Sequence, residues 1–153
     1  HEGLKARALR QSCAAALKDL EDPQLSDWLS LSRFLAETAD EVSWAVEEAD
    51  RFKVAADRYV VGMAGRLKEA AAEYLKAMRV FAERERCAGH LAAAKRIALE
   101  AEGFFRKART SALEDVNVVS GLKNGEVYRR LSQAAEGLQK SADLLAEILV
   151  ARK

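Results

Sequence analysis

The chain has 153 residues, of which 50% are hydrophobic and 32% are charged, a composition typical of a folded domain and not of a disordered segment. Its 25 Lys and Arg nearly balance its 24 Asp and Glu, and the net charge of +1 argues against a dedicated nucleic-acid-binding protein. No apolar run reaches the roughly 18–20 residues of a membrane span. We therefore expect residues 1–153 to form a single domain without a membrane span or a nucleic-acid partner.

Apolar residues recur every three or four positions along the whole chain, which predicts an all-α fold. The first helix is expected to bury Leu9, Cys13, Ala16 and Leu20, and the letters EDPQ end it. Asp22 then serves as the N-cap of a second helix that begins near Pro23 and runs to about residue 55.

The second half of the chain continues this pattern. We expect a poorly defined boundary near residues 60–65, a third helix over 64–81, and a fourth over 91–112 after the charged letters ERER. The stretch LEDVNVVSGLKNGE, residues 113–126, is interpreted as a loop because Gly and Asn-Gly are typical turn residues. The last helix has the most regular apolar stripe: Val127, Leu131, Ala134, Leu138, Ala142, Leu145 and Leu149. About five amphipathic helices with short connections predict an antiparallel bundle.

The residues that catalysis usually requires are scarce. His1 and His90 are the only histidines, and the chain has no Glu-x-x-His, P-loop, GxGxxG or GxSxG motif. Cys13 and Cys87 belong to no Cys-x-x-Cys pair, so nothing points to an oxidising compartment. We expect a cytoplasmic protein that is not an enzyme and needs no cofactor.

Trp44 occupies an unexpected position on the second helix. A helical wheel gathers Leu31, Leu35, Val42, Val46 and Ala49 into a core stripe. Trp44 falls on the opposite side, in the company of the acidic residues Glu37, Glu41 and Glu48. The wheel therefore predicts that Trp44 does not fill the core of this stripe.

Several segments resemble the PhoU-like family, in the cytoplasmic branch that accompanies Pit-type phosphate transporters. The stretch SDWLSLSRFLAETADEVSWAVEEADRF is similar to the central helix of that family, and EVYRRLSQAAEGLQKSADLLAEIL is similar to its last helix. HEGLKAR and IALEAEGFFRKA resemble two further motifs, in the family's order. The resemblance implies a PhoU-like bundle that lacks the family's first helix, which would precede His1.

The family's characteristic motif is an acidic residue followed four positions later by Asp, a pair that binds metal ions together with pairs on facing helices. Here the expected Asp is replaced by Leu4, Trp44 and Phe104, and Ser132 stands where the last helix would offer Glu, leaving Glu136. The resemblance therefore implies that a metal-binding face has become an apolar contact face. Leu4, Trp44 and Phe104 are the candidate partner-binding residues.

The function implied by the resemblance is that of a non-enzymatic accessory protein of inorganic phosphate transport, which docks as a helix bundle onto a transporter or its signalling partner at the inner membrane surface. Three alternatives stay open. Trp44 serves packing alone or contacts a second copy in a homodimer; residual acids, Glu37, Asp40, Glu41 and Glu136, hold a metal ion; or the chain is a generic helical scaffold or lipid-surface protein. Against lipid binding, Lys and Arg are scattered among acids along the sequence.

Overall fold

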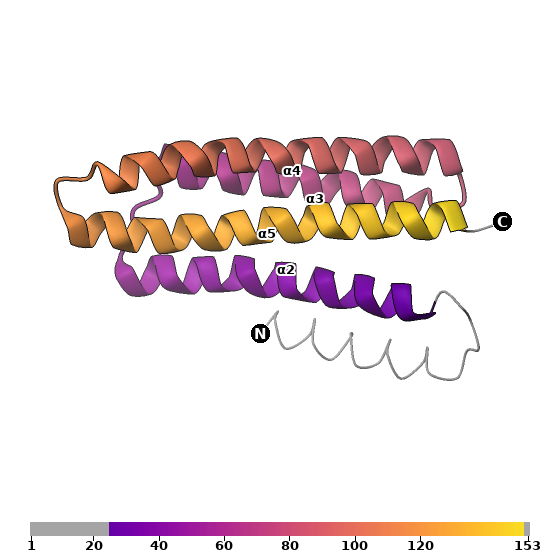
Figure 1. The fold of residues 1–153 in the computed structure, drawn as a ribbon, viewed down its shortest axis with the longest axis horizontal. Helices are drawn as coiled ribbons and strands as arrows, with labels where there is room; N and C mark the ends of the chain where they lie inside the picture. Colours follow the sequence, from indigo (N-terminus) through magenta and orange to yellow (C-terminus); the bar gives the residue numbers. More distant parts are fainter. Residues whose placement is uncertain (1–24, 152–153) are drawn as a thin grey trace.

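The computed structural model describes residues 25–151, which form four helices: α2 (Leu25–Phe52), α3 (Arg58–Arg79), α4 (Arg84–Leu113) and α5 (Val118–Ala151). Consecutive helices run in opposite directions, and short connections join them at the two ends of the bundle (Figure 1). The predicted all-α antiparallel bundle is confirmed. The helix expected to carry Leu9 to Leu20 lies outside the described residues. None of the four helices has the length and apolarity that crossing a bilayer requires.

Among the four described helices, α5 is the centre of the arrangement, because it packs against α2, α3 and α4, whereas α2 packs along α5 alone (Figure 1). Its buried side chains follow a seven-residue repeat in two parallel rows, which is what a helix with neighbours on several sides requires. The first row is Tyr128, Leu131, Ala135, Leu138, Ala142, Leu145 and Leu149; the second is Val127, Ala134, Ser141 and Ile148. Every residue of the apolar stripe predicted for the last helix is buried.

Small residues fill much of the interface between α3, α4 and α5. Six alanines on α3 and α4 are almost completely buried: Ala70, Ala77, Ala94, Ala98, Ala101 and Ala108. Larger side chains form two clusters, one around Met63 and Leu131 and the other around Tyr74, Cys87 and Leu145. Alanine has no side chain beyond Cβ, so the helices approach closely, and the larger residues fill the remaining space as close packing demands.

The connection between α2 and α3 is shorter than the sequence suggests. Lys53 takes a left-handed backbone conformation with φ of 55°, and Asp57 caps α3 by accepting hydrogen bonds from the amides of Tyr59 and Val60, both at 2.9 Å. The hydroxyl of Tyr128 donates to the other carboxylate oxygen of Asp57, which ties the cap to α5. Because this cap starts the helix at Arg58, the predicted boundary near residues 60–65 is wrong.

The connection between α4 and α5 also differs from its prediction, since only residues 114–117 are non-helical within the expected loop 113–126. The side chain of Asn117 accepts a hydrogen bond from the amide of Ser120 at 3.1 Å and so starts α5 early. Gly121 serves close packing and not a turn: a Cβ at this position would lie 2.3 Å from the carbonyl oxygen of Ala112. Gly121, a residue type that is common in turns, therefore lies inside α5, at the place where α5 passes close to the end of α4.

Candidate interaction surfaces

The face of α2 that packs on α5 differs from the predicted core stripe. The buried residues of α2 are Leu31, Thr38 and Ala45, spaced by seven. Val42 and Val46, which the wheel placed in the core, are 38% and 66% exposed. The prediction is wrong for these two valines, whereas Leu31 of the same stripe is buried and Leu35 and Ala49 pack against the core. Thr38 and Ala45, which the stripe left out, are buried beside them.

Small residues matter here because α2 and α5 nearly touch. A Cβ on Gly137 of α5 would lie 2.2 Å from the side-chain oxygen of Thr38. The Thr38 hydroxyl donates to the carbonyl of Phe34 at 2.8 Å, so this buried polar group is satisfied within its own helix. Glycine at position 137 therefore sets the distance between the two helices.

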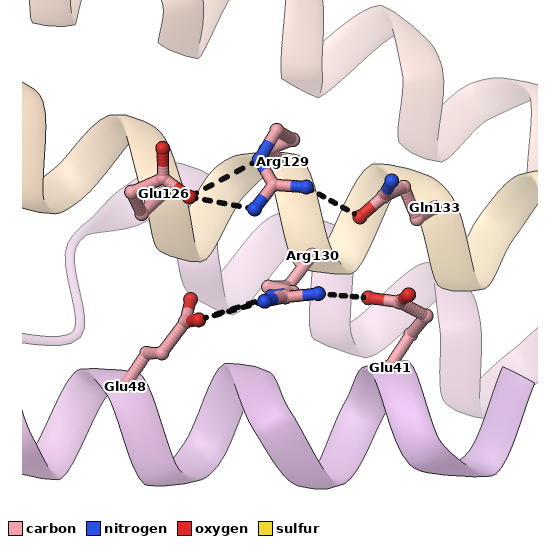
Figure 2. A network of polar contacts seen from close by, with 6 residues as sticks. All are labelled: Glu41, Glu48, Glu126, Arg129, Arg130 and Gln133. Atoms are coloured by element: carbon pink, nitrogen blue, oxygen red, sulfur yellow. Dashed lines mark hydrogen bonds and ion pairs between the residues drawn. The ribbon is translucent and has the colours of Figure 1, made fainter. Parts of the chain in front are cut away.

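Acidic residues of α2 bind an arginine of α5 beside this contact. The guanidinium of Arg130 donates to Glu48 at 3.0 and 3.1 Å and to Glu41 at 3.2 Å, and all three side chains are half-buried (Figure 2). Hydrogen bonding to Glu48, and then to Glu41, raises the pKa of Arg130 further above its ordinary value. The cluster thus joins α2 to α5 through a cation held between two carboxylates.

Trp44 belongs to the same cluster. The guanidinium carbon of Arg130 lies 4.9 Å from the centre of the indole ring, within the range of a cation–π contact. The wheel correctly grouped Trp44 with Glu41 and Glu48, but that side of α2 faces α5 and Arg130. Trp44 remains 39% exposed, so its outer part is available to solvent.

The three candidate partner-binding residues are not brought together as one surface in the described part of the chain. Phe104 on α4 is half-buried and packs over Gly62 of α3, where an added Cβ would lie 2.6 Å from the phenyl ring. Trp44 belongs to the contact between α2 and α5. Leu4 lies outside the described residues. Partner binding by these three residues stays a prediction.

The four acids considered as residual metal ligands face different surroundings. Glu37 lies 3.8 Å from Arg33, Glu41 binds Arg130, and Glu136 lies 2.7 Å from Lys140, whereas Asp40 is a half-buried residue of α2. Within residues 25–151, no group of three or more His, Cys, Asp or Glu is arranged so that it could hold a metal ion.

His90 takes part in an ion-pair network between α3 and α4. Its Nδ1 lies 2.7 Å from Glu73, which also accepts a hydrogen bond from Lys76 at 2.5 Å. The hydrogen bond from Lys76, followed by that from His90, lowers the pKa of Glu73. Cys87 is buried, which raises the pKa of its thiol and keeps it in the protonated, weakly nucleophilic form. These groups form interhelical contacts, and we assign them no chemistry.

Within residues 25–151, exposed large apolar side chains are most concentrated where α4 turns into α5, at one end of the bundle (Figure 1). Five large aliphatic residues within ten positions are mostly exposed, and Val116 is 100% exposed. We call this surface the α4–α5 tip: Leu113, Val116, Val118, Val119 and Leu122. Large contiguous apolar patches on a folded protein commonly mark interaction sites. The apolar letters VNVV, residues 116–119, could have indicated this exposed surface from the sequence. The prediction of a loop over this stretch did not consider them.

Two pockets flank the first turns of α5 at this tip. One, of about 430 Å³, lies between α4 and α5, with Leu113, Val118 and Leu122 in its lining together with the more deeply placed Phe105. The other, of about 350 Å³, lies between α5 and the connection from α2 to α3, and Val119 and Lys123 line it. The exposed apolar residues therefore occur on both flanks of α5 and at the turn itself.

Cations surround the tip. Arg106, Lys107 and Arg109 in the last turns of α4, and Lys123 in the first turns of α5, are exposed and form no ion pair with another described residue. Of the acids nearby, Glu126 binds Arg129 at 2.7 Å, whereas Asp115 accepts the amide of Asn117 at 2.8 Å and keeps its negative charge. The tip therefore combines an apolar surface with unpaired positive charge.

Comparisons of this chain with models of protein families, with curated proteins and with solved structures found no match. The resemblance to the PhoU-like family therefore rests on the sequence patterns alone and stays a prediction.

Proposed function

We propose that this chain is a non-enzymatic accessory protein that docks at a membrane-associated partner through its α4–α5 tip. The observation that carries the proposal is the cluster of five exposed aliphatic residues beside a 430 Å³ pocket lined largely by apolar side chains. Leaving these side chains in water forgoes the stabilisation that burial provides, about 25 cal/mol for each Å² of apolar surface. A partner that covers the tip would recover it.

The sequence resemblance adds an expected identity for the partner. A Pit-type phosphate transporter, or the signalling protein that works with it, is the partner that the PhoU-like pattern implies. The regulator would then act by occupying a transporter surface, with apolar anchors supplying affinity and charged neighbours setting the orientation. The polar contacts of Arg130, Glu73 and His90 join helices to one another, and the proposed role assigns them no further task.

Co-sedimentation with membranes of the source organism tests the docking. We expect the wild-type chain to sediment with these membranes and Val116→Asp to lose most of this binding, because the substitution places a charge at the most exposed apolar position. Val150→Asp is the matched control, since Val150 is similarly exposed and lies in the last turn of α5, whose end is opposite the tip (Figure 1). Equal binding of all three proteins, or no binding at all, would contradict docking through the tip.

Membranes that lack the transporter test the partner. If the chain regulates a Pit-type transporter by contact, binding should fall when the transporter gene is deleted and return when it is restored. Binding that is unaffected by the deletion would exclude the transporter as the docking partner and leave docking itself in place.

A further inference from the structure

We propose that the α4–α5 tip binds the surface of an anionic lipid bilayer directly, with its aliphatic side chains in the interface and the surrounding cations next to lipid phosphates. This inference rests on the proposed docking through the tip and names what the tip touches. The contact with the bilayer is peripheral: the exposed turn at residues 114–117 and the adjoining ends of α4 and α5 touch the membrane surface.

The distribution of the apolar residues favours a flat surface over a partner helix. Val118 and Leu122 lie beside the pocket between α4 and α5, whereas Val119 lies beside the pocket on the other flank of α5. Val116 lies between the two helices, in the connecting turn, and is fully exposed. A helix lying in either pocket would cover one flank and leave the other in water. If the bundle approaches a bilayer with this end first, the apolar side chains on both flanks of α5 and in the turn can enter the interface together.

The positions of the cations fit the same geometry. Arg106 and Arg109 lie on the last two turns of α4, within about 10 Å of Leu113 along the helix axis at 1.5 Å per residue. Lys107 is two residues from Arg109 and so points to another side of the helix, and Lys123 extends the set to α5. Long basic side chains reach along an apolar surface toward lipid phosphates, and each one near an anionic membrane strengthens binding.

The sequence order hides this arrangement. Arg106 and Lys123 are 17 positions apart, and acids occur between them, so no single helix shows a basic face. The turn at residues 114–117 brings the end of α4 beside the start of α5, and it gathers these cations at one end of the molecule (Figure 1). Cations that are scattered among acids along the sequence therefore lie together at one end of the folded chain.

Other occupants fit less well. Two copies meeting tip to tip would bring unpaired cations of the same sign together, which opposes a dimer through this surface. The described chain begins at Leu25 and ends at Ala151, and both residues lie at the opposite end of the bundle (Figure 1).

Asp115 and Glu114 both oppose binding to an anionic surface, and Glu114 is the more exposed of the two. Glu114 directly follows Leu113 and forms no ion pair with another described residue. Its negative charge would face lipid phosphates and the apolar interface at once. The proposal therefore makes an unusual prediction: Glu114→Gln should bind anionic vesicles more tightly than the wild type.

Vesicle co-sedimentation of the whole chain tests the proposal. The probes are vesicles of phosphatidylcholine alone and vesicles of equal parts phosphatidylcholine and phosphatidylglycerol. We expect at least about tenfold tighter binding to the anionic vesicles, weakened by added salt because exposed charges are screened. Val116→Asp and the double variant Lys107→Glu/Arg109→Glu should each reduce this binding several-fold. The matched controls, Val150→Asp and Lys68→Glu on the exposed side of α3, should leave it unchanged.

The outcomes separate this inference from the proposed function. Binding to membranes of the source organism without binding to either kind of vesicle would overturn the lipid proposal and support a protein partner at the same tip. Equal binding to both kinds of vesicle, or equal losses in the tip and control variants, would also overturn it. Failure to bind both vesicles and native membranes would remove docking through the tip altogether.

Discussion

The guanidinium of Arg130 lies over the indole ring of Trp44 while it donates to carboxylates on either side of that ring in sequence, Glu41 and Glu48. One arginine of α5 therefore contacts three residues of α2, spaced along about two helical turns. Figure 2 shows the two glutamates on either side of the guanidinium. Because α2 packs along no other helix of the described chain, these contacts bear directly on whether α2 stays attached.

Substituting Arg130 should loosen α2. Arg130→Met removes the hydrogen bonds to both glutamates and leaves two half-buried carboxylates without their cation, so we expect a loss of about 1–3 kcal/mol in the free energy of unfolding. Urea denaturation measures it. Arg129→Met is the neighbouring control, because Arg129 binds only Glu126 and Gln133 of its own helix (Figure 2) and should change stability by less than about 0.5 kcal/mol. Equal effects of the two substitutions would show that Arg130 does not hold α2.

A methyl group at Gly137 should push the same two helices apart. Gly137→Ala places a Cβ against Thr38, and we expect a destabilisation of about 1–3 kcal/mol in urea denaturation. The double variant Gly137→Ala/Thr38→Ala should cost less than the sum of the single changes, because the smaller residue at position 38 makes room for the methyl group.

The control for this substitution is Gly65→Ala in α3, where an added Cβ meets nothing within 4 Å. Alanine is favoured over glycine inside a helix by roughly 0.5–1 kcal/mol, so this variant should be more stable than the wild type. A Gly137→Ala protein as stable as Gly65→Ala would contradict the close approach of α2 and α5.

The network around Glu73 should make stability depend on pH. The hydrogen bonds from Lys76 and His90 lower the pKa of Glu73 below its ordinary value of 4.5. A carboxyl group with a lowered pKa in the folded state contributes stability above the unfolded pKa and loses it as the pH falls through the folded value. The wild type should therefore lose more stability than Glu73→Gln when the pH is lowered from neutral through 4.5 and below. Denaturant midpoints measured at several pH values give the comparison, and parallel curves for the two proteins would exclude this contribution.

Helical periodicity predicted α5 best. Each residue expected on its stripe, from Val127 to Leu149, is buried, because this stretch of α5 packs against α2, α3 and α4. The same reasoning was wrong for Val42 and Val46 of α2. Within residues 25–151, α2 packs against a single helix, so its largest apolar residues need not lie on the side that faces α5.

The candidate sites were less predictable than the helices. Spacing alone grouped Trp44 with Glu41 and Glu48, but only the packing of α2 on α5 supplied Arg130, which lies more than 80 positions further along the chain. The sequence did not predict the tip, because glycine and asparagine in residues 117–125 are typical of turns. They led to the prediction of a loop where α5 in fact begins, at Val118. Local patterns say which residue types lie close together along the chain, and they carry no information about which distant residue a side chain meets.

The amino-acid sequence by itself determined that the described chain is built from amphipathic helices in alternating directions, since the spacing of apolar residues and the short connections are local properties. Tertiary structure alone decided that the ion pairs of Arg130 with Glu41 and Glu48, and the close approach at Gly137, join α2 to α5. It alone placed the free cations of α4 and α5 around five exposed aliphatic residues. The physical reason is that electrostatic and packing contacts act through space, over distances of a few ångströms that sequence separation does not measure.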